Sequence, residues 1–175
     1  AAAKSPPSGA SGAARGSAKS SRASTRPRAS FARRPRCCRA ASGAPMKVVK
    51  ALEENGAVVV AYENCGGTKS VDRLIDESAE DIYEAIAERY LQIGCSVMTP
   101  NKNRYELIGR LIEEYQIDGV VEMTLQACHT YNVEAKSIEK FVKGKGVPYI
   151  HVETDYSQED IGQLNTRMTA FVEML

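Results

Sequence analysis

The 175-residue sequence has no tryptophan, two histidines and no apolar run near the roughly 20 residues that a membrane-spanning helix needs. The apolar run Ala57–Tyr62 is among the longest, so we expect a soluble protein without membrane contact. Motifs of several large enzyme classes are missing too. No Gly-x-Gly-x-x-Gly follows a predicted strand, and there is no Walker lysine loop and no Gly-x-Ser-x-Gly elbow.

Acidic residues are missing from the first 45 positions, which contain ten Lys or Arg among Ala, Ser, Pro and Gly. Such a composition cannot bury enough apolar surface to offset the loss of chain entropy. We therefore expect residues 1–45 to be a disordered basic tail, followed by an α/β domain over residues 46–175. The tail resembles an organellar transit peptide, and it equally fits a wrongly assigned reading frame.

Residues 46–175 contain the remaining thirteen basic residues and all 22 acidic ones. This part of the chain is therefore acidic and gives no indication of nucleic-acid binding. Five cysteines without the apolar core of a signal peptide indicate a reducing compartment, where thiols serve metals or catalysis more often than disulfides. We expect a cytoplasmic location, or an organellar one if the tail is a transit peptide.

Helical and strand patterns alternate from Met46 onwards. Apolar runs predict strands over 57–62, 118–124 and 147–152, and helical periodicity predicts helices over 46–55, 79–93, about 101–115, 131–143 and from 157 to the end. In the 79–93 helix, the apolar residues share one face. This order predicts a three-layer α/β domain of the Rossmann-like or flavodoxin-like kind, with a parallel sheet whose strand exits share one edge.

Three cysteines stand in the loops expected at that edge. Cys65 follows the first strand, Cys128 follows the second, and Cys95 lies between two helices. Their separations, 30 and 33 residues, differ from the close pairs of zinc fingers and ferredoxins. A site assembled from distant loops therefore remains, and thiolate ligands suit zinc or an iron–sulfur cluster. Cys37 and Cys38 fall in the tail and are expected to be incidental.

Residues beside these cysteines are candidates for further roles. Gly66 and Gly67 would let the backbone approach a bulky inorganic group, although such a turn is common after a strand. Glu63 and His129 could transfer protons to a substrate. Alternatively, Glu63 caps its loop and His129 bonds a carbonyl.

Four longer segments carry a family resemblance. They are Tyr62-Glu-Asn-Cys-Gly-Gly67, Cys95-Ser-Val-Met-Thr-Pro-Asn101, the run 124–134 containing Cys-His-Thr-Tyr-Asn, and 153–167 with Glu-Thr-Asp-Tyr-Ser and Gly-Gln-Leu-Asn-Thr-Arg. Over about residues 42–175 the chain resembles the cluster-bearing subunits of the 2-hydroxyacyl-CoA dehydratase and benzoyl-CoA reductase superfamily. The Cys-His-Thr-Tyr-Asn segment with the other two cysteines looks most like the double-cubane-cluster reductases.

The resemblance implies an iron–sulfur cofactor, either a double-cubane or a single four-iron cluster. In the reductase branch Cys65, Cys95 and Cys128 would all be ligands. In the dehydratase branch Cys128 matches a ligand, and the other two are not assigned. The resemblance also implies low-potential electrons from an ATP-dependent iron–sulfur activator protein, an anaerobic setting, and a homodimer or a heterodimer with a paralogous subunit.

Family members have an additional N-terminal α/β domain that supplies further cluster cysteines. Here only the low-complexity tail precedes residue 42, so the chain resembles the C-terminal domain alone. Three hypotheses follow: an iron–sulfur reductase, a 2-hydroxyacyl-CoA dehydratase subunit, or a non-catalytic fragment of either.

Overall fold

The computed structural model describes residues 33–41 and 46–175, and residues 33–175 form one compact unit. The described strands build one parallel sheet in the order β2-β1-β3-β4. Their bounds are β1 Arg36–Ala41, β2 Val58–Glu63, β3 Gly119–Leu125 and β4 Tyr149–Thr154. The predicted α/β class with a parallel sheet is confirmed.

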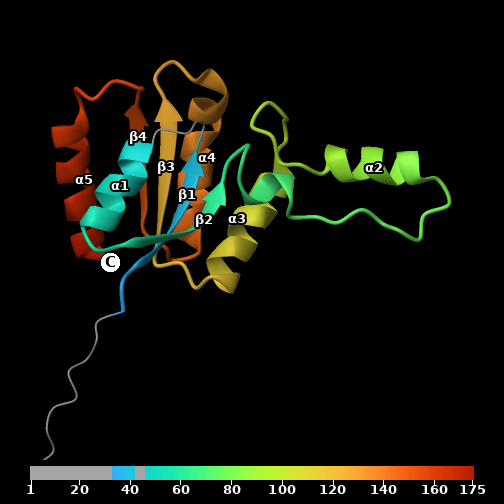
Figure 1. The fold of residues 1–175 in the computed structure, drawn as a ribbon, viewed down its shortest axis with the longest axis horizontal. Helices are drawn as coiled ribbons and strands as arrows, with labels where there is room; N and C mark the ends of the chain where they lie inside the picture. Colours follow the sequence, from blue (N-terminus) through green and yellow to red (C-terminus); the bar gives the residue numbers. More distant parts are fainter. Residues whose placement is uncertain (1–32, 42–45) are drawn as a thin grey trace, which may run out of the picture. The chain divides into compact units, whose positions relative to one another are not determined.

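The helices divide between the two faces of this sheet (Figure 1). Helices α1 and α5 pack on one face, and α3 and α4 pack on the other, which gives the three layers. The bounds are α1 Met46–Glu54, η1 Thr68–Ser70, α2 Ile82–Leu91, α3 Lys102–Glu114, α4 His129–Gly144 and α5 Ile161–Met174.

Side chains of successive strand residues point to opposite faces of a sheet, and β1 shows this plainly. Cys37 packs in the core beneath α1 and α5, whereas Cys38 packs in the core beneath α3 and α4. Neighbouring strand β3 is buried on both faces through Thr124, as expected for a central parallel strand. Strands β1 and β3 therefore contribute side chains to the apolar cores on both faces of the sheet.

The sequence-based boundary at residue 45 is wrong for the segment 33–41. Strand β1 lies in the middle of the sheet between β2 and β3, and both of its cysteines are fully buried. Its entry is fixed at Asp118, which accepts hydrogen bonds from the Arg36 backbone N–H and the Arg33 guanidinium, both 2.7 Å long. The expected disorder of residues 1–32 and 42–45 lies outside the described residues.

The predicted 79–93 helix forms as α2, beginning after Asp81, whose carboxylate accepts bonds from two first-turn N–H groups. Its apolar face does not behave as the periodicity indicates. Tyr83 and Leu91 are 81% and 70% exposed, and only Ala85 of the helix is buried. Figure 1 shows α2 on a segment that leaves the layers, which explains why its apolar stripe meets no core.

Among the described helices, none is both long and apolar enough to span a membrane.

A serine at Cys37 tests the central position of β1. We expect Cys37→Ser to lower the free energy of unfolding by about 1–3 kcal/mol, because the hydroxyl would be buried among apolar side chains. Urea unfolding followed by circular dichroism measures this. Cys65→Ser, at an exposed cysteine, is the control and should stay within about 0.5 kcal/mol of the parent. Equal effects of the two variants would contradict the place of β1 in the core.

Candidate functional site

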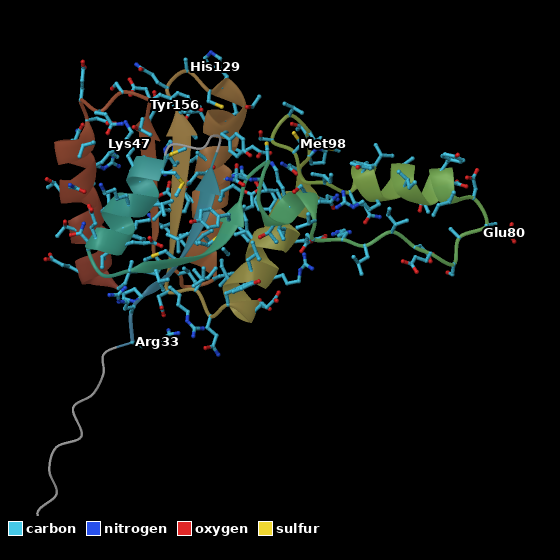
Figure 2. All side chains as sticks on the ribbon, viewed as in Figure 1. Arg33, Lys47, Glu80, Met98, His129 and Tyr156 are labelled. Atoms are coloured by element: carbon cyan, nitrogen blue, oxygen red, sulfur yellow. The ribbon has the colours of Figure 1, made fainter. Side chains whose placement is uncertain are left out.

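The three candidate cysteines lie on loops at the carboxyl end of the sheet or next to it. Cys65 follows β2 by two residues and is exposed, and Cys128 directly precedes α4 and is half-buried. Cys95 lies between α2 and α3 and is half-buried as well. All five cysteines of the chain lie in the described part, and none of them is in a disulfide. Figure 2 shows His129, next to Cys128, beyond the tip of the sheet.

These thiols do not form a closed site for a single ion. Within residues 33–41 and 46–175, no three His, Cys, Asp or Glu side chains are grouped so that they could hold one metal ion. A single-zinc site made by this segment alone is therefore not supported. The donor chemistry still suits an iron–sulfur cluster, because each thiolate binds a different iron atom of the cluster.

Beneath this edge lies a buried ionic network centred on Arg104 of α3. The Arg104 guanidinium is fully buried and donates to Glu63 at 3.1 Å, to Glu122 at 3.1 Å and to Glu134 at 2.8 Å. Tyr149 donates a further 2.6 Å bond to Glu122. Since an unpaired buried charge is costly, each carboxylate fixes the element that carries it relative to Arg104.

The network connects the three cysteine loops to one another. Glu63 ends β2, two residues before Cys65, and Glu134 lies in the second turn of α4, which begins just after Cys128. The third loop is tied by Asn101, whose side-chain amide donates to the Cys95 carbonyl at 2.9 Å and to Glu134 at 3.0 Å. Arg104 is thus linked to the Cys65 loop through Glu63, and to the Cys128 and Cys95 loops through Glu134.

A second cation extends the network towards Cys65. Lys69 is buried, its ammonium lies 3.9 Å from Glu63, and it donates a 3.0 Å hydrogen bond to the Tyr131 hydroxyl. Glu63 Oε1 has no hydrogen-bond partner among the described residues. The positive charges of Lys69 and Arg104 nevertheless lie close to the Glu63 carboxylate.

Burial and charge act together on these groups. Burial raises the pKa of Glu63, and the positive charges of Arg104 and Lys69 oppose that shift. Burial alone would lower the pKa of Arg104, but Glu63 and Glu122 outweigh it and hold that pKa above its usual value. Arg104 therefore remains charged at all physiological pH values.

The two glycines after Cys65 differ in their surroundings. A Cβ atom on Gly67 would lie 2.2 Å from the Tyr62 carbonyl oxygen, so this glycine is needed by the turn itself. A Cβ on Gly66 would meet nothing within 4 Å. Near Cys95, a Cβ on Gly94 would lie 2.7 Å from the Arg104 backbone nitrogen, so Gly94 lets that loop approach α3 closely.

The two residues suggested for proton transfer lie in different settings. Glu63 is buried in the ionic network, whereas His129 is exposed in the first turn of α4. On the buried side of the same edge, His151 Nε2 lies 2.7 Å from the Thr124 hydroxyl, which also donates to Asn132. The structure thus places Glu63 inside the protein and His129 on its surface.

Sequence reasoning missed the network, whose members include Lys69, Arg104, Glu122, Tyr131 and Glu134. One signal was available, because Glu122 interrupts the apolar run of β3, and a charge inside a central strand must find a partner. Arg104 gave no comparable signal, since it lies one turn before the apolar stripe of α3.

Replacement of the central arginine tests the network. Arg104→Met should lower the free energy of unfolding by about 3–5 kcal/mol, because buried carboxylates lose their partner. Without Arg104 the pKa of Glu63 rises further, so the folded state binds its proton more tightly. The deficit should therefore grow as the pH rises above 4.5, the ordinary glutamate value. Urea unfolding at pH 5 and pH 8 measures both effects.

Arg110→Met is the matched control, because Arg110 lies on the same helix but its side chain, which pairs with Asp72, is half exposed. Its effect should stay below about 1 kcal/mol. A similar, pH-independent loss in both variants would show that Arg104 acts through side-chain packing alone.

Comparison with known proteins gives one family. The family model described as 2-hydroxyglutaryl-CoA dehydratase, D-component, matches residues 34–175. The match therefore includes β1, which the sequence-based resemblance from about residue 42 left out. The superfamily suggested by the sequence motifs is confirmed.

Two curated relatives are similar over this region. The Escherichia coli K12 protein YjiM, provisionally described as a dehydratase subunit, is 52% identical over 134 residues, 76% of this chain and 35% of the relative. The beta subunit of (R)-2-hydroxyglutaryl-CoA dehydratase from Acidaminococcus fermentans is 21% identical over 133 residues, 73% of this chain and 35% of the relative. The chain thus spans about a third of the length of these relatives.

Proposed function

Since the chain belongs to the 2-hydroxyglutaryl-CoA dehydratase D-component family, we propose that it is the cysteine-bearing part of an iron–sulfur dehydratase subunit that acts on a 2-hydroxyacyl-CoA. The observation that carries the proposal is the common support of three cysteine loops by one buried arginine. Two fully buried carboxylates and a third, partly buried one surround this guanidinium, and such a costly arrangement favours loops that must keep a fixed geometry.

The Cys128 thiolate is the first candidate to hold the cluster, and Cys65 and Cys95 would join it in a site of the reductase type. The cluster, when bound, supplies one-electron reduction at the carboxyl edge of the sheet. The chain's own part is to position and shield the thiolates. Cys128 is held near the start of α4, with Thr130 Oγ1 3.5 Å from its sulfur. His129, exposed beside it, is the candidate for moving protons at the open side, and Glu63 is the candidate on the buried side.

Further subunits and an ATP-dependent activator iron–sulfur protein are the partners we propose. The Acidaminococcus relative is named as a beta subunit, which favours a multi-subunit assembly. Its length, about three times the matched region, leaves room for residues that complete a cluster site. That agrees with the open, incomplete arrangement of thiols in this segment.

A double-cubane reductase is the second candidate function. It is favoured by the presence of three cysteines on supported loops, because the dehydratase branch accounts only for Cys128. The two candidates make different demands on the cysteines, so a series of single variants separates them.

Anaerobic reconstitution with iron and sulfide tests the proposal on the full chain. We expect thiolate-to-iron charge-transfer absorption that Cys128→Ser weakens strongly, because a ligand to the cluster is lost. In a dehydratase-type site Cys65→Ser and Cys95→Ser retain most of the bound iron, whereas in a reductase-type site each of them loses it. Cys37→Ser, in the core, is the control and should retain iron. Equal iron uptake by Cys128→Ser and the parent protein would contradict the assignment.

A further inference from the structure

Residues 71–93, which we call the arm, expose much of their apolar surface. The arm contains α2 and the segment before it, and Figure 1 shows α2 outside the layers of the domain. Seven of the fifteen large apolar side chains that are exposed in the described residues belong to the arm, with Leu74, Tyr83 and Leu91 at 91%, 81% and 70%. Apolar surface gathered in this way marks an interaction site.

The exposed side chains of α2 form a stripe with an acidic border. Tyr83, Ala87 and Leu91 follow one another at intervals of four residues, so they share one face of the helix. Glu84 and Glu88 have the same spacing and lie beside that face. The whole arm contains seven acidic residues and two basic ones. The arm therefore suits a partner surface that is apolar and basic.

The base of the arm is fixed to the domain. Arg73 donates to Gln92 Oε1 at 2.8 Å and to Glu106 of α3 at 3.3 Å. Arg89 donates to the Arg73 carbonyl at 3.0 Å, and the Asn103 amide donates to the Gln92 carbonyl at 3.0 Å. These bonds set the direction of α2, although a ten-residue helix is only marginally stable in water without a packing partner.

A groove with the matching chemistry lies between α3 and α4. This α3/α4 groove has a volume of about 540 Å³ and is lined by Tyr105, Ser137, Lys140, Phe141, Gly144 and Lys145. The Tyr105 and Phe141 rings supply apolar surface and pack edge to face, with 5.3 Å between their centroids. Residues 136–145 contain four lysines and one glutamate, so the border of the groove is basic even though Lys145 also pairs with Glu113.

We propose that the arm of one copy of this chain docks in the α3/α4 groove of a second copy. The stripe of α2 covers Tyr105 and Phe141 of the other copy, and Glu84 and Glu88 face Lys140 there. Figure 1 shows α2 extending away from α3 and α4 of its own chain, which favours docking between two copies. The opposite charges of the arm and the groove select this pairing.

Reciprocal docking closes a dimer in which both arms and both grooves are covered. Tyr83, Tyr90 and Leu91 of the two arms, with the surface that they cover, would bury on the order of 1,000 Å², the size at which a specific interface becomes stable. This inference deepens the proposed function and rests on it only for the expectation of more than one subunit. It requires neither cluster nor substrate.

Sedimentation velocity of the metal-free full chain, up to about 100 μM, tests the dimer. We expect a monomer–dimer equilibrium that the double variant Tyr83→Ser/Leu91→Ser weakens by about 100-fold or more, since each substitution acts at both contacts. Both side chains are exposed, so the fold should tolerate the change. Met174→Ser, at a 62% exposed apolar residue of α5, is the matched control and should stay within about twofold of the parent. A monomeric parent, or equal dissociation constants of parent and double variant, would overturn the proposal.

Charge reversal tests whether the α3/α4 groove is the partner surface. Glu84→Lys/Glu88→Lys and Lys140→Glu should each weaken the dimer, because each brings like charges together across the contact. A chain with all three substitutions restores opposite charges and should regain part of the lost affinity. A loss in this chain equal to the sum of the separate losses would contradict the pairing of arm and groove.

Zero-length carbodiimide cross-linking of a mixture of unlabelled and isotope-labelled chains, read by mass spectrometry, tests docking between copies. Cross-links from Glu84 or Glu88 to Lys140 or Lys145 should join an unlabelled peptide to a labelled one. Cross-links found only within one label would show that the arm reaches the groove of its own chain, and they would overturn the dimer. Because this protein is metal-free, failure here and failure of iron uptake by the parent are separate results.

Discussion

Arg104 is fully buried between three glutamates, and the arrangement of the carboxyl edge depends on that single cation. Taking a guanidinium and several carboxylates out of water carries a large desolvation penalty, which close pairing only just repays. Such a cluster adds little net stability compared with an apolar core. It does impose geometry, because any displacement of β2, β3, α3 or α4 leaves a buried charge without its partner.

The Arg104 network supports all three cysteine loops. Each loop is short and attached within a few residues to a member of the network: Glu63 for Cys65, Asn101 for Cys95 and Glu134 for Cys128. The loops themselves are more exposed than the network below them. The Arg104 network therefore holds the backbone of the three loops while their thiols stay accessible, which suits a metal centre that groups outside this segment complete. The relatives, about three times as long as the matched region, have room for such groups.

The fold class and the three cysteine loops could be predicted from sequence because apolar runs and glycine-terminated helices follow simple periods. Strand β1 could not, since Arg-Cys-Cys-Arg-Ala-Ala contains no β-branched residue and becomes a strand only because two strands flank it. The apolar stripe of α2 failed in the opposite way: its period is helical, but periodicity does not say whether a partner is present. The Arg104 network could not be predicted, because charged residues are usually exposed and a single sequence does not show which of them the fold brings into contact.

Hydrogen exchange of the full chain, followed by mass spectrometry, compares the parent with Arg104→Lys and tests whether Arg104 holds the three cysteine loops. A lysine retains the charge but cannot bond three carboxylates in the planar geometry of a guanidinium. We expect faster exchange in all three peptides 63–70, 94–101 and 125–132 together, with α1 and α5 unchanged. Faster exchange confined to the peptide that contains residue 104 would contradict the claim that this arginine holds the three cysteine loops.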